Sequence, residues 1–520
     1  MKWFGWLSYL IVLGFSGLAF FGLFSVGQTQ IPWELIQDPY LQNVLIFSLK
    51  QAAYSALLSV VLAIPVALTL YFRPGIFASK EFQVLCLLAF VLPSLVLITG
   101  LVALLGRSGV ITPWAQQLLS FWNIQWNLYG LTGILMAHVY LNFPFAIRSL
   151  HLQLSQIPES SWRLARHLKL TPWQQWRTLI WPNINQSVFL LLGFIGILCF
   201  NSFAVVLALG GGPKSTTLEV AIFQALKYDF NIGEALLLAW LQLLIAGGAF
   251  LLISNLGQLN WLNLDVKGNQ FRPKLSGFKR LISATLYAAS WLFLLAPLLA
   301  IFHKLIDPKF FTLPWVSIGL ALGRSIFIAL AASVLALVLA YGLLLPIRSS
   351  QKKWQQQSWY WLANHTLILP AMVLSVGIYI WLLPRFSPED TALLWLVAIN
   401  ALVIIPFAIT QLKSALLTFD TQYQRLMALL KLPNPQRWWI EFKFLNKPFV
   451  TSFALCWVLA VGDVAVFAIF GNQDWVTLPW LIYTFAGSYR LTEAAMAAFV
   501  LLAISGLAVW ILERSIRVKH

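Results

Sequence analysis

The chain has 520 residues, of which 60% are hydrophobic and 10% are charged, and its mean hydropathy is +0.80. A soluble protein of this length needs a far more polar surface, so the composition excludes a water-soluble globular protein and indicates a membrane protein. The formal net charge of +17 is spread over short loops between apolar runs. Charges placed in this way form no basic groove or domain, which excludes nucleic acid as the partner.

Long apolar runs follow one another along the chain, each roughly 18–25 residues long and able to cross a bilayer as a helix. The runs are continuous, whereas the strands of a transmembrane barrel alternate apolar and polar residues. We therefore predict an all-α polytopic membrane protein with about 12 transmembrane helices. In chain order the predicted spans are 4–25, 43–72, 83–106, 128–150, 185–209, 234–256, 281–303, 319–346, 358–384, 392–415, 447–471 and 493–513. The first is too long for a signal peptide and lacks a cleavage site, so we expect it to be retained.

The basic residues predict the orientation of this bundle in the membrane. An even number of spans puts both termini on one side, and 25 of the 34 Lys and Arg residues lie in the loops and termini of that side. Cytoplasmic loops carry an excess of basic residues. We therefore expect both termini, and the polar stretch 257–280, to be cytoplasmic.

The sequence contains an internal repeat. "LPSLVLITG" at 92–100 returns as "LPAMVLSVG" at 369–377, and "PFAI" at 144–147 returns at 406–409. The matches keep their order and each copy holds six spans, so the halves share one orientation and a pseudo-twofold axis along the membrane normal. The predicted domains are a first half at 1–256 with its core at about 43–256, a cytoplasmic linker at 257–280, and a second half at 281–520 with its core at about 319–513.

A basic, amphipathic insert appears in each half, as "RLARHLKLTPWQQW" at 163–176 and "RLMALLKLPNPQRW" at 425–438. Pro158 and Glu159 suit the first turn of a helix in the first insert, and Asp420 and Thr421 can cap a helix in the second. We predict a short cytoplasmic helix in each insert. One alternative is a helix that lies on lipid headgroups. Two repeat-related helices, however, suit a twofold-symmetric partner that receives each helix in a groove.

These inserts resemble the coupling loops of type I ABC importer permeases, whose pattern is Glu-Ala-Ala, three residues, then Gly. In "RLARHLK" Ala165 agrees, Arg163 stands for the Glu and Lys169 for the Gly, while in "RLMALLK" none of the four positions agrees. The resemblance implies the MetI-like fold and two copies of a cytoplasmic ABC ATPase subunit. The residues expected to couple to the ATPase are Arg163, Leu164, Ala165, Leu168, Lys169, Arg425, Leu426, Leu430 and Lys431.

Three further segments carry a closer resemblance. "SFAVVLALGGGPKSTTLEVAIFQALKYDF" at 202–230, "GDVAVFAIFGNQDWVTLPWLIYTFAGSYR" at 462–490 and "AHVYLNFP" at 137–144 are similar to segments of thiamine and thiamine diphosphate ABC transporter permeases. The resemblance covers nearly the whole chain. It implies a bacterial inner-membrane protein that translocates thiamine and its phosphate esters, and a periplasmic thiamine-binding protein as partner. Fused ferric-iron permeases share the two-half layout, so ferric iron is the alternative cargo.

The chain is expected to be a transport subunit rather than an enzyme, without a cofactor. "GGGPKST" at 210–216 lacks the Gly that precedes the Lys of a phosphate-binding loop, so ATP hydrolysis is assigned to a separate subunit. The three cysteines lie in apolar runs, no metal-site spacing is found, and no catalytic set can be assembled. An ion-coupled secondary transporter is a further alternative, but it predicts several ionisable residues within spans, and only Asp463 is clearly placed so.

Two groups of polar residues are candidates for contact with cargo or with the periplasmic partner. Along the translocation path we expect Asp463, its repeat counterpart Ser202, His138 and Phe467, with hydrogen bonding between helices as the alternative role of the polar ones. For docking of the binding protein we expect Lys214, Lys227, Asp229 and Arg490, with ordinary solvated loop charge as the alternative.

Overall fold

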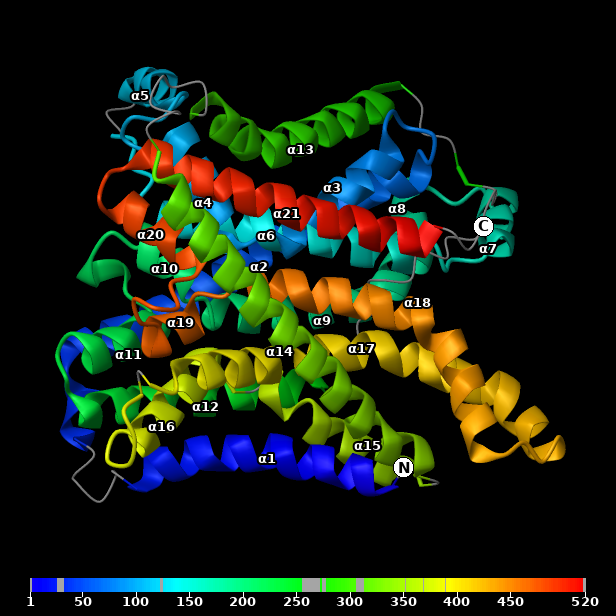
Figure 1. Cartoon of the computed structure of the whole chain (residues 1–520). Coiled ribbons are helices and arrows are strands. Elements are labelled where there is room, and N and C mark those ends of the chain that lie inside the picture. The colour runs from blue at the N-terminus through cyan, green and yellow to red at the C-terminus, as the bar shows by residue number, and fades with distance from the viewer. Residues whose placement is uncertain are drawn as a thin grey trace.

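The computed structural model is a bundle of helices that run mostly along one common direction (Figure 1). It describes residues 2–25, 32–121, 125–254, 272–273, 277–304, 313–350, 352–367, 369–388 and 390–517. Within these ranges it contains helices and turns but no strand, which confirms the predicted all-α class.

The helices of the first half are α1 (Lys2–Ser25), α2 (Pro39–Phe72), α3 (Ser79–Val91), α4 (Ser94–Leu105), α5 (Thr112–Ser120), α6 (Leu131–Leu154), α7 (Glu159–His167), α8 (Pro172–Gln175), α9 (Trp181–Phe200), α10 (Ala204–Leu209), α11 (Leu218–Lys227) and α12 (Ile232–Ser254). Those of the second half are α13 (Gly277–Lys304), α14 (Trp315–Ser349), α15 (Lys353–Ala363), α16 (Ala371–Leu382), α17 (Ala392–Leu429), α18 (Asn434–Val461), α19 (Ala465–Phe470), α20 (Leu478–Gly487) and α21 (Leu491–Arg517).

Nine helices of the described part are long and apolar enough to cross a membrane, and α3 with α4 is a further candidate that is bent by 105°. The two remaining predicted spans coincide with α6 and with α15–α16. Four predicted spans contain a break, and the breaks form repeat-related pairs. One pair lies at the Leu-Pro steps 92–93 and 369–370, because a residue that precedes proline is forced out of the helical region. The other pair lies at 201–203 and 462–464.

The first helix of each half packs against the opposite half. Helix α1 contacts α14 and α16, whereas α13 contacts α2 and α4, on opposite sides of the bundle (Figure 1). Small residues allow these close approaches: a Cβ on Gly22 is 1.9 Å from the Gly377 carbonyl oxygen, and one on Gly100 is 2.5 Å from the Pro297 carbonyl oxygen. Close backbone approach at small residues is typical of helix packing in membranes. The two halves are thus interlocked.

The repeat is visible in individual hydrogen bonds. The Ser48 hydroxyl oxygen accepts a hydrogen bond from the Leu218 N–H at 3.0 Å, and the Ser325 hydroxyl oxygen accepts one from the Leu478 N–H at 2.7 Å. These bonds join α2 to α11 in the first half and α14 to α20 in the second. They align the halves residue by residue, with Ser48 matched to Ser325 and Leu218 matched to Leu478.

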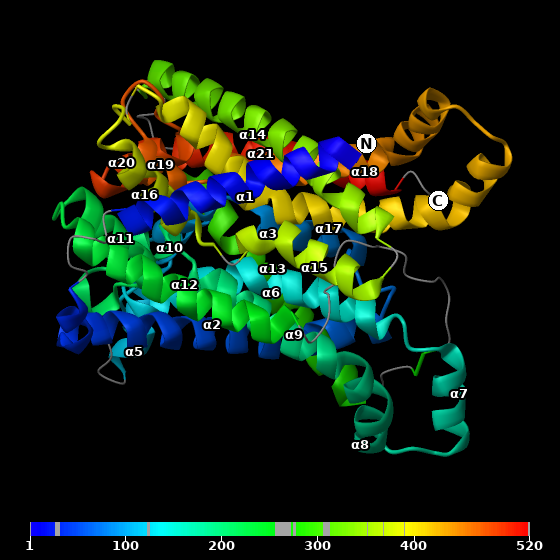
Figure 2. The same ribbon diagram turned by 90° about the horizontal axis from the view of Figure 1, so that it is seen from below.

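Both inserts project from the same end of the bundle. Figure 2 shows α7 and α8 on one arm, and the junction of α17 and α18 on another, beyond the ends of the other helices. The beginning of α1 and the end of α21 lie at this end too, whereas α11 and α20 lie at the other (Figure 1). The fold therefore places the inserts, which carry the predicted ATPase-coupling residues, and the helices α11 and α20 near the predicted docking residues at opposite ends of the bundle.

Candidate functional site

The first insert forms the predicted amphipathic helix, α7. Pro158 has an extended backbone and is followed by the acidic first turn at Glu159. Trp162 and Ala165 are buried, and the indole N–H of Trp162 donates a hydrogen bond to the Tyr71 hydroxyl at 2.7 Å. On the other face Leu164 and Leu168 are 59% and 62% exposed. The outer face of the insert therefore exposes two leucine side chains that a partner could contact.

The second insert is built differently from the prediction. Asp420 and Thr421 do not cap a new helix, because α17 continues through them to Leu429. The exposed leucines nevertheless recur: Leu426 and Leu430 are 50% and 60% exposed, while Met427 is buried. Met427 corresponds to Ala165 in the repeat. Each half thus has a buried residue on one face of its insert and exposed leucines at two repeat-related positions on the other, and the second half adds Leu429, which is 81% exposed.

The turn after each insert has the same backbone conformation in both halves. Lys169 has φ 52° and Lys431 has φ 47°, both in the left-handed region. The Leu170 N–H donates to the Ala165 carbonyl at 3.0 Å, and the Leu432 N–H donates to the Met427 carbonyl at 3.3 Å. These are the six-to-one bonds of a Schellman turn, which favours glycine at the left-handed position. Each lysine stands where the coupling-loop pattern has Gly, so the turn is kept although the residue has changed.

The other predicted coupling residues lie on these surfaces. Arg163 is exposed, and its Nε donates a hydrogen bond to Glu159 Oε1 at 2.9 Å. The backbone of Arg425 belongs to α17, and its side chain lies outside the described residues. We define the coupling surfaces as Leu164 and Leu168 in the first half, and Leu426 and Leu430 in the second.

Each coupling surface is anchored to the equivalent core helix by different chemistry. In the second half Arg348, near the end of α14, donates to both carboxylate oxygens of Asp420, at 2.8 and 2.6 Å, and to Glu441 at 2.7 Å. The corresponding residue of α2 in the first half is Tyr71. Its hydroxyl accepts the Trp162 bond, and the guanidinium of Arg272, from the linker, lies 4.4 Å from its ring centroid. One anchor is therefore ionic and the other aromatic.

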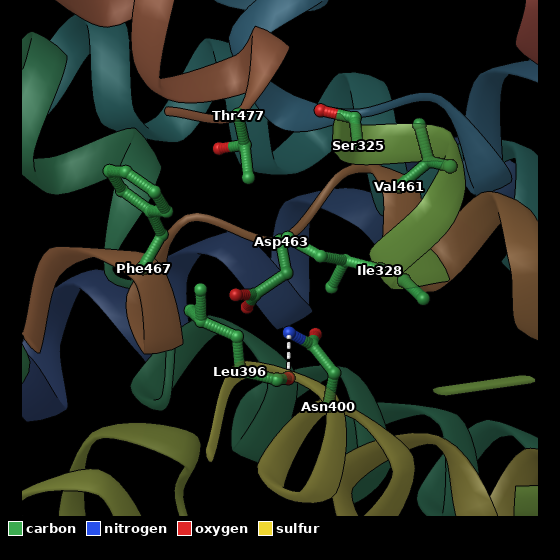
Figure 3. Close-up of a pocket in the computed structure, with 9 residues that line it drawn as sticks. Ser325, Ile328, Leu396, Asn400, Val461, Asp463, Phe467 and Thr477 are labelled. Carbon is green, nitrogen blue, oxygen red and sulfur yellow. Dashed lines mark hydrogen bonds between the residues drawn. The ribbon is translucent and has the colours of Figure 1, made fainter. Parts of the chain in front are cut away.

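A small pocket lies at the break between α18 and α19 (Figure 3). Asp463 sits in this break rather than inside a continuous helix, and its carboxylate accepts a hydrogen bond from the Val466 N–H at 3.1 Å. The Asn400 amide faces the same carboxylate (Figure 3). The buried ring of Phe467 lines one side, and the hydroxyl of Thr477, which is 7% exposed, has no hydrogen-bond partner in the described part of the chain. The pocket therefore joins one carboxylate, an aromatic ring and an unpaired hydroxyl.

The structure separates the four predicted path residues into two places. Asp463 and Phe467 both line the pocket of the second half. Ser202 lies in the matching break of the first half, between α9 and α10. His138 is 2% exposed in α6, and its Nδ1 lies 3.0 Å from the Ser55 hydroxyl.

The four predicted docking residues flank α11 and the α20–α21 junction in the chain, and α11 and α20 lie at the end of the bundle opposite the inserts (Figure 1). Lys214 and Asp229 are exposed. The Lys227 ammonium lies 4.7 Å from the ring centroid of Tyr379, across the boundary between the halves. Arg490 forms an ion pair with Glu493 at 3.0 Å.

Sequence reasoning missed two buried carboxylates: Glu441 of the Arg348 cluster, which is 4% exposed, and Glu219, which is 1% exposed in the first turn of α11. The Gln242 side-chain N–H donates to Glu219 at 2.6 Å and to the Asn201 side-chain oxygen at 3.3 Å. The signal was present in "TTLEVAIF", where a lone acidic residue stands in an apolar stretch. No group of three or more metal-ligating side chains occurs among the residues that the structure describes.

Comparison with known proteins assigns the family. Residues 55–259 match the model of the binding-protein-dependent transport system inner membrane component. The thiamine transport system permease protein of Haemophilus influenzae is 34% identical to this chain, over 96% of this chain and 93% of its own length. That of Escherichia coli is 35% identical over 93% and 91%, and that of Brucella abortus 31% identical over 89% and 86%. The chain belongs to the thiamine transport permease family.

Membership of this permease family confirms the predicted class of function. The chain is a membrane-embedded permease subunit of an ABC importer and not an enzyme. The fused two-half organisation agrees with the near full-length matches to the relatives. An ATPase and a binding protein are implied as partners, because the family transports in a binding-protein-dependent manner.

Proposed function

We propose that this chain forms the pathway through which an ATP-driven importer moves thiamine and its phosphate esters across the bacterial inner membrane. The observation that carries the proposal is the identity of 31–35% with three thiamine transport permeases along almost their whole length. The two-half layout is common to thiamine and ferric-iron permeases and does not distinguish their cargo. Sequence identity with thiamine permeases through both halves does, and it supports thiamine.

Two copies of the ATPase subunit dock at this permease, one on each coupling surface. The proposal is supported by Leu164 and Leu168 in one half and Leu426 and Leu430 in the other, which are exposed at repeat-related positions on the same end of the bundle. Exposed apolar anchors on a helix suit a groove on a partner. The chain termini lie at this end, so both are assigned to the cytoplasm, and the basic loops agree with that orientation.

The periplasmic thiamine-binding protein docks at the opposite end. Lys214, Asp229 and Arg490 are exposed there and are available for polar contacts at the rim of such an interface. Lys227 takes part less directly, because its ammonium group already lies over the Tyr379 ring. Rim charges act mainly on the rate of association and on its salt dependence.

The Asp463 pocket is assigned to the translocation path. A carboxylate at membrane depth costs about 2.5–3.5 kcal/mol on insertion scales, so its retention calls for a partner or a function. The thiazolium ring of thiamine carries a permanent positive charge, which a carboxylate stabilises. The Phe467 ring beside the carboxylate adds a cation–π surface for the same charge.

The proposal is tested with the permease and its ATPase reconstituted in proteoliposomes, with ATP inside and the thiamine-loaded binding protein outside. We expect ATP-dependent thiamine uptake, and none of ferric iron. Asp463→Asn should reduce thiamine uptake severely at unchanged assembly with the ATPase, whereas Asp474→Asn, at an exposed position on the same outer segment, should leave uptake unchanged. If Asp463→Asn takes up thiamine at the wild-type rate, the role of Asp463 is structural and consists of its hydrogen bond with α19. Uptake of ferric iron but not thiamine refutes the proposed cargo.

A further inference from the structure

A second polar cluster occupies the place in the first half that the Asp463 pocket occupies in the second. The repeat aligns Gln51 with Ile328, His138 with Asn400, and Thr217 with Thr477. The second member of each pair lines the Asp463 pocket. Of the first members, Gln51 donates a hydrogen bond to the Cys199 carbonyl, just before the break that contains Ser202, and the repeat relates His138 and Thr217 to residues beside the second break. The structure therefore places two related polar sites beside the two breaks.

The first-half cluster holds polar atoms that the protein leaves unpaired. Gln51, His138 and Thr217 are 0%, 2% and 0% exposed, and Gln51 Oε1, His138 Nε2 and Thr217 Oγ1 have no hydrogen-bond partner in the described part of the chain. Gln242 Oε1 is unpaired in the same way. Buried polar atoms are rarely left without a partner, so several of them in one place indicate a missing ligand or water.

The cluster contains a carboxylate that the second-half pocket lacks at the same position. Glu219 follows Thr217 by two residues, and its carboxylate is tied through Gln242 to Asn201, at the break itself. Helix α11, which carries Glu219, contacts α19, which begins just after Asp463. Each half thus contributes one carboxylate, and the helix that carries Glu219 packs against the helix that follows Asp463 across the boundary between the halves.

The chemistry of the unpaired atoms indicates what kind of group fits. Glu219, Gln51 and Gln242 offer oxygen atoms that accept hydrogen bonds, and the nearby donors of Gln51 and Gln242 are already engaged, that of Gln51 with the Cys199 carbonyl at 2.8 Å. The Thr217 hydroxyl and His138 Nε2 can each donate or accept, so acceptors outnumber obligatory donors and favour a ligand that donates hydrogen bonds. Thiamine combines such a group, the amino substituent of its pyrimidine ring, with a second ring that carries a fixed positive charge.

We propose that Gln51, His138, Thr217, Glu219 and Gln242 form a second cargo-binding site, which takes the hydrogen-bond-donating amino-heterocycle of the cargo while the Asp463 pocket takes its cationic ring. The proposal rests on the proposed thiamine transport. Each half of the permease then binds one of the two different rings of the cargo. This explains why the two copies of the repeat have diverged at these positions. Glu219 is the principal acceptor for the amino group.

The test measures selectivity rather than activity alone. Uptake of thiamine is compared with uptake of an analogue in which a carbonyl oxygen replaces the pyrimidine amino group, in proteoliposomes with the same binding protein throughout. For each permease we take the ratio of thiamine uptake to analogue uptake. Any preference of the binding protein cancels when this ratio for a variant is divided by the ratio for the wild type. Glu219→Gln keeps size and shape but offers a donor to the carbonyl. A hydrogen bond to a charged group contributes about 1.5–3 kcal/mol, so the preference for thiamine should fall by about tenfold or more.

Matched variants separate this outcome from a structural defect. Glu234→Gln removes a carboxylate at the start of α12, the helix that carries Gln242, and should leave the ratio unchanged. If Glu219→Gln fails to assemble with the ATPase, Gln51→Ile, which introduces the residue found at the same position of the second half, should lower the ratio in the same direction. An unchanged ratio in an assembled variant shows that water fills the cluster and overturns the inference, while thiamine uptake by the wild type still supports the proposed function. Absence of thiamine uptake by the wild type refutes the proposed function itself.

Discussion

Arg348 is expected to hold the second coupling surface in place, and Arg348→Met tests this. The side chains of Arg348, Asp420 and Glu441 are 16%, 13% and 6% exposed, so the three charges are largely removed from water. The substitution leaves two carboxylates close together without a cation. Loss of one partner from a buried ion pair costs about 3–5 kcal/mol, because the remaining charge is uncompensated. The effect falls on the end of α14 and on the junction of α17 and α18, at the end of the bundle that carries the inserts.

Hydrogen exchange of the purified permease–ATPase complex measures this cost locally. A loss of about 3–5 kcal/mol corresponds to exchange that is roughly 10²-fold to 4 × 10³-fold faster for amides that open together, and we expect it in peptides covering 415–445. Arg324→Met, at the other end of α14, should leave these peptides unchanged, since Arg324 contacts the Gln473 carbonyl at 3.5 Å there.

A rescue variant identifies the cause. Arg348→Met combined with Asp420→Asn and Glu441→Gln removes all three charges, and replacing a complete buried ion cluster by neutral groups is often tolerated. Exchange should return most of the way to the wild-type rate. Wild-type exchange in Arg348→Met alone refutes the anchoring role, and failure of the neutral triple variant to recover refutes uncompensated charge as the reason.

The remaining predictions concern the coupling surfaces and the topology. Leu168→Asp together with Leu430→Asp should abolish ATP-driven uptake by placing a charge in each groove of the partner, while insertion into the membrane is retained; normal uptake contradicts the docking role. Lys169→Gly should raise the free energy of unfolding by about 1 kcal/mol, because glycine adopts the left-handed conformation without steric cost, and a lowered thermal midpoint contradicts this. In intact cells, an impermeant thiol reagent should label Ser215→Cys and not Ser276→Cys, and the reverse pattern inverts the orientation.

Properties that depend on short stretches of chain were accessible from the sequence. The length of the apolar runs indicates a helical membrane protein, since a span must match the bilayer. The repeated "LPSLVLITG" and "LPAMVLSVG" motifs even contain the prolines, Pro93 and Pro370, that directly precede α4 and α16. The two exposed leucines of each insert follow from helical spacing.

Predictions from neighbouring residues were wrong, or could not be made, where a residue far away in the chain supplies the hydrogen-bond or packing partner. Asp420 followed by Thr421 is a good helix start in isolation, but Arg348 from α14 pairs with Asp420 and α17 continues through it. Asp463 was expected within a span, and its place in a break depends on packing of α18 and α19 that no nearby proline announces.

The pairing of the two halves lies furthest beyond the reach of sequence patterns. Helices α1 and α13 are equally apolar on their own, and their exchange between halves depends on the close fit of Gly22 to Gly377 and of Gly100 to Pro297. The same long-range packing brings Glu219 toward Asp463 from the opposite half. Hydrophobic length and periodicity are properties of one segment, whereas the surface on which a helix packs is set by the shapes of residues hundreds of positions away in the chain.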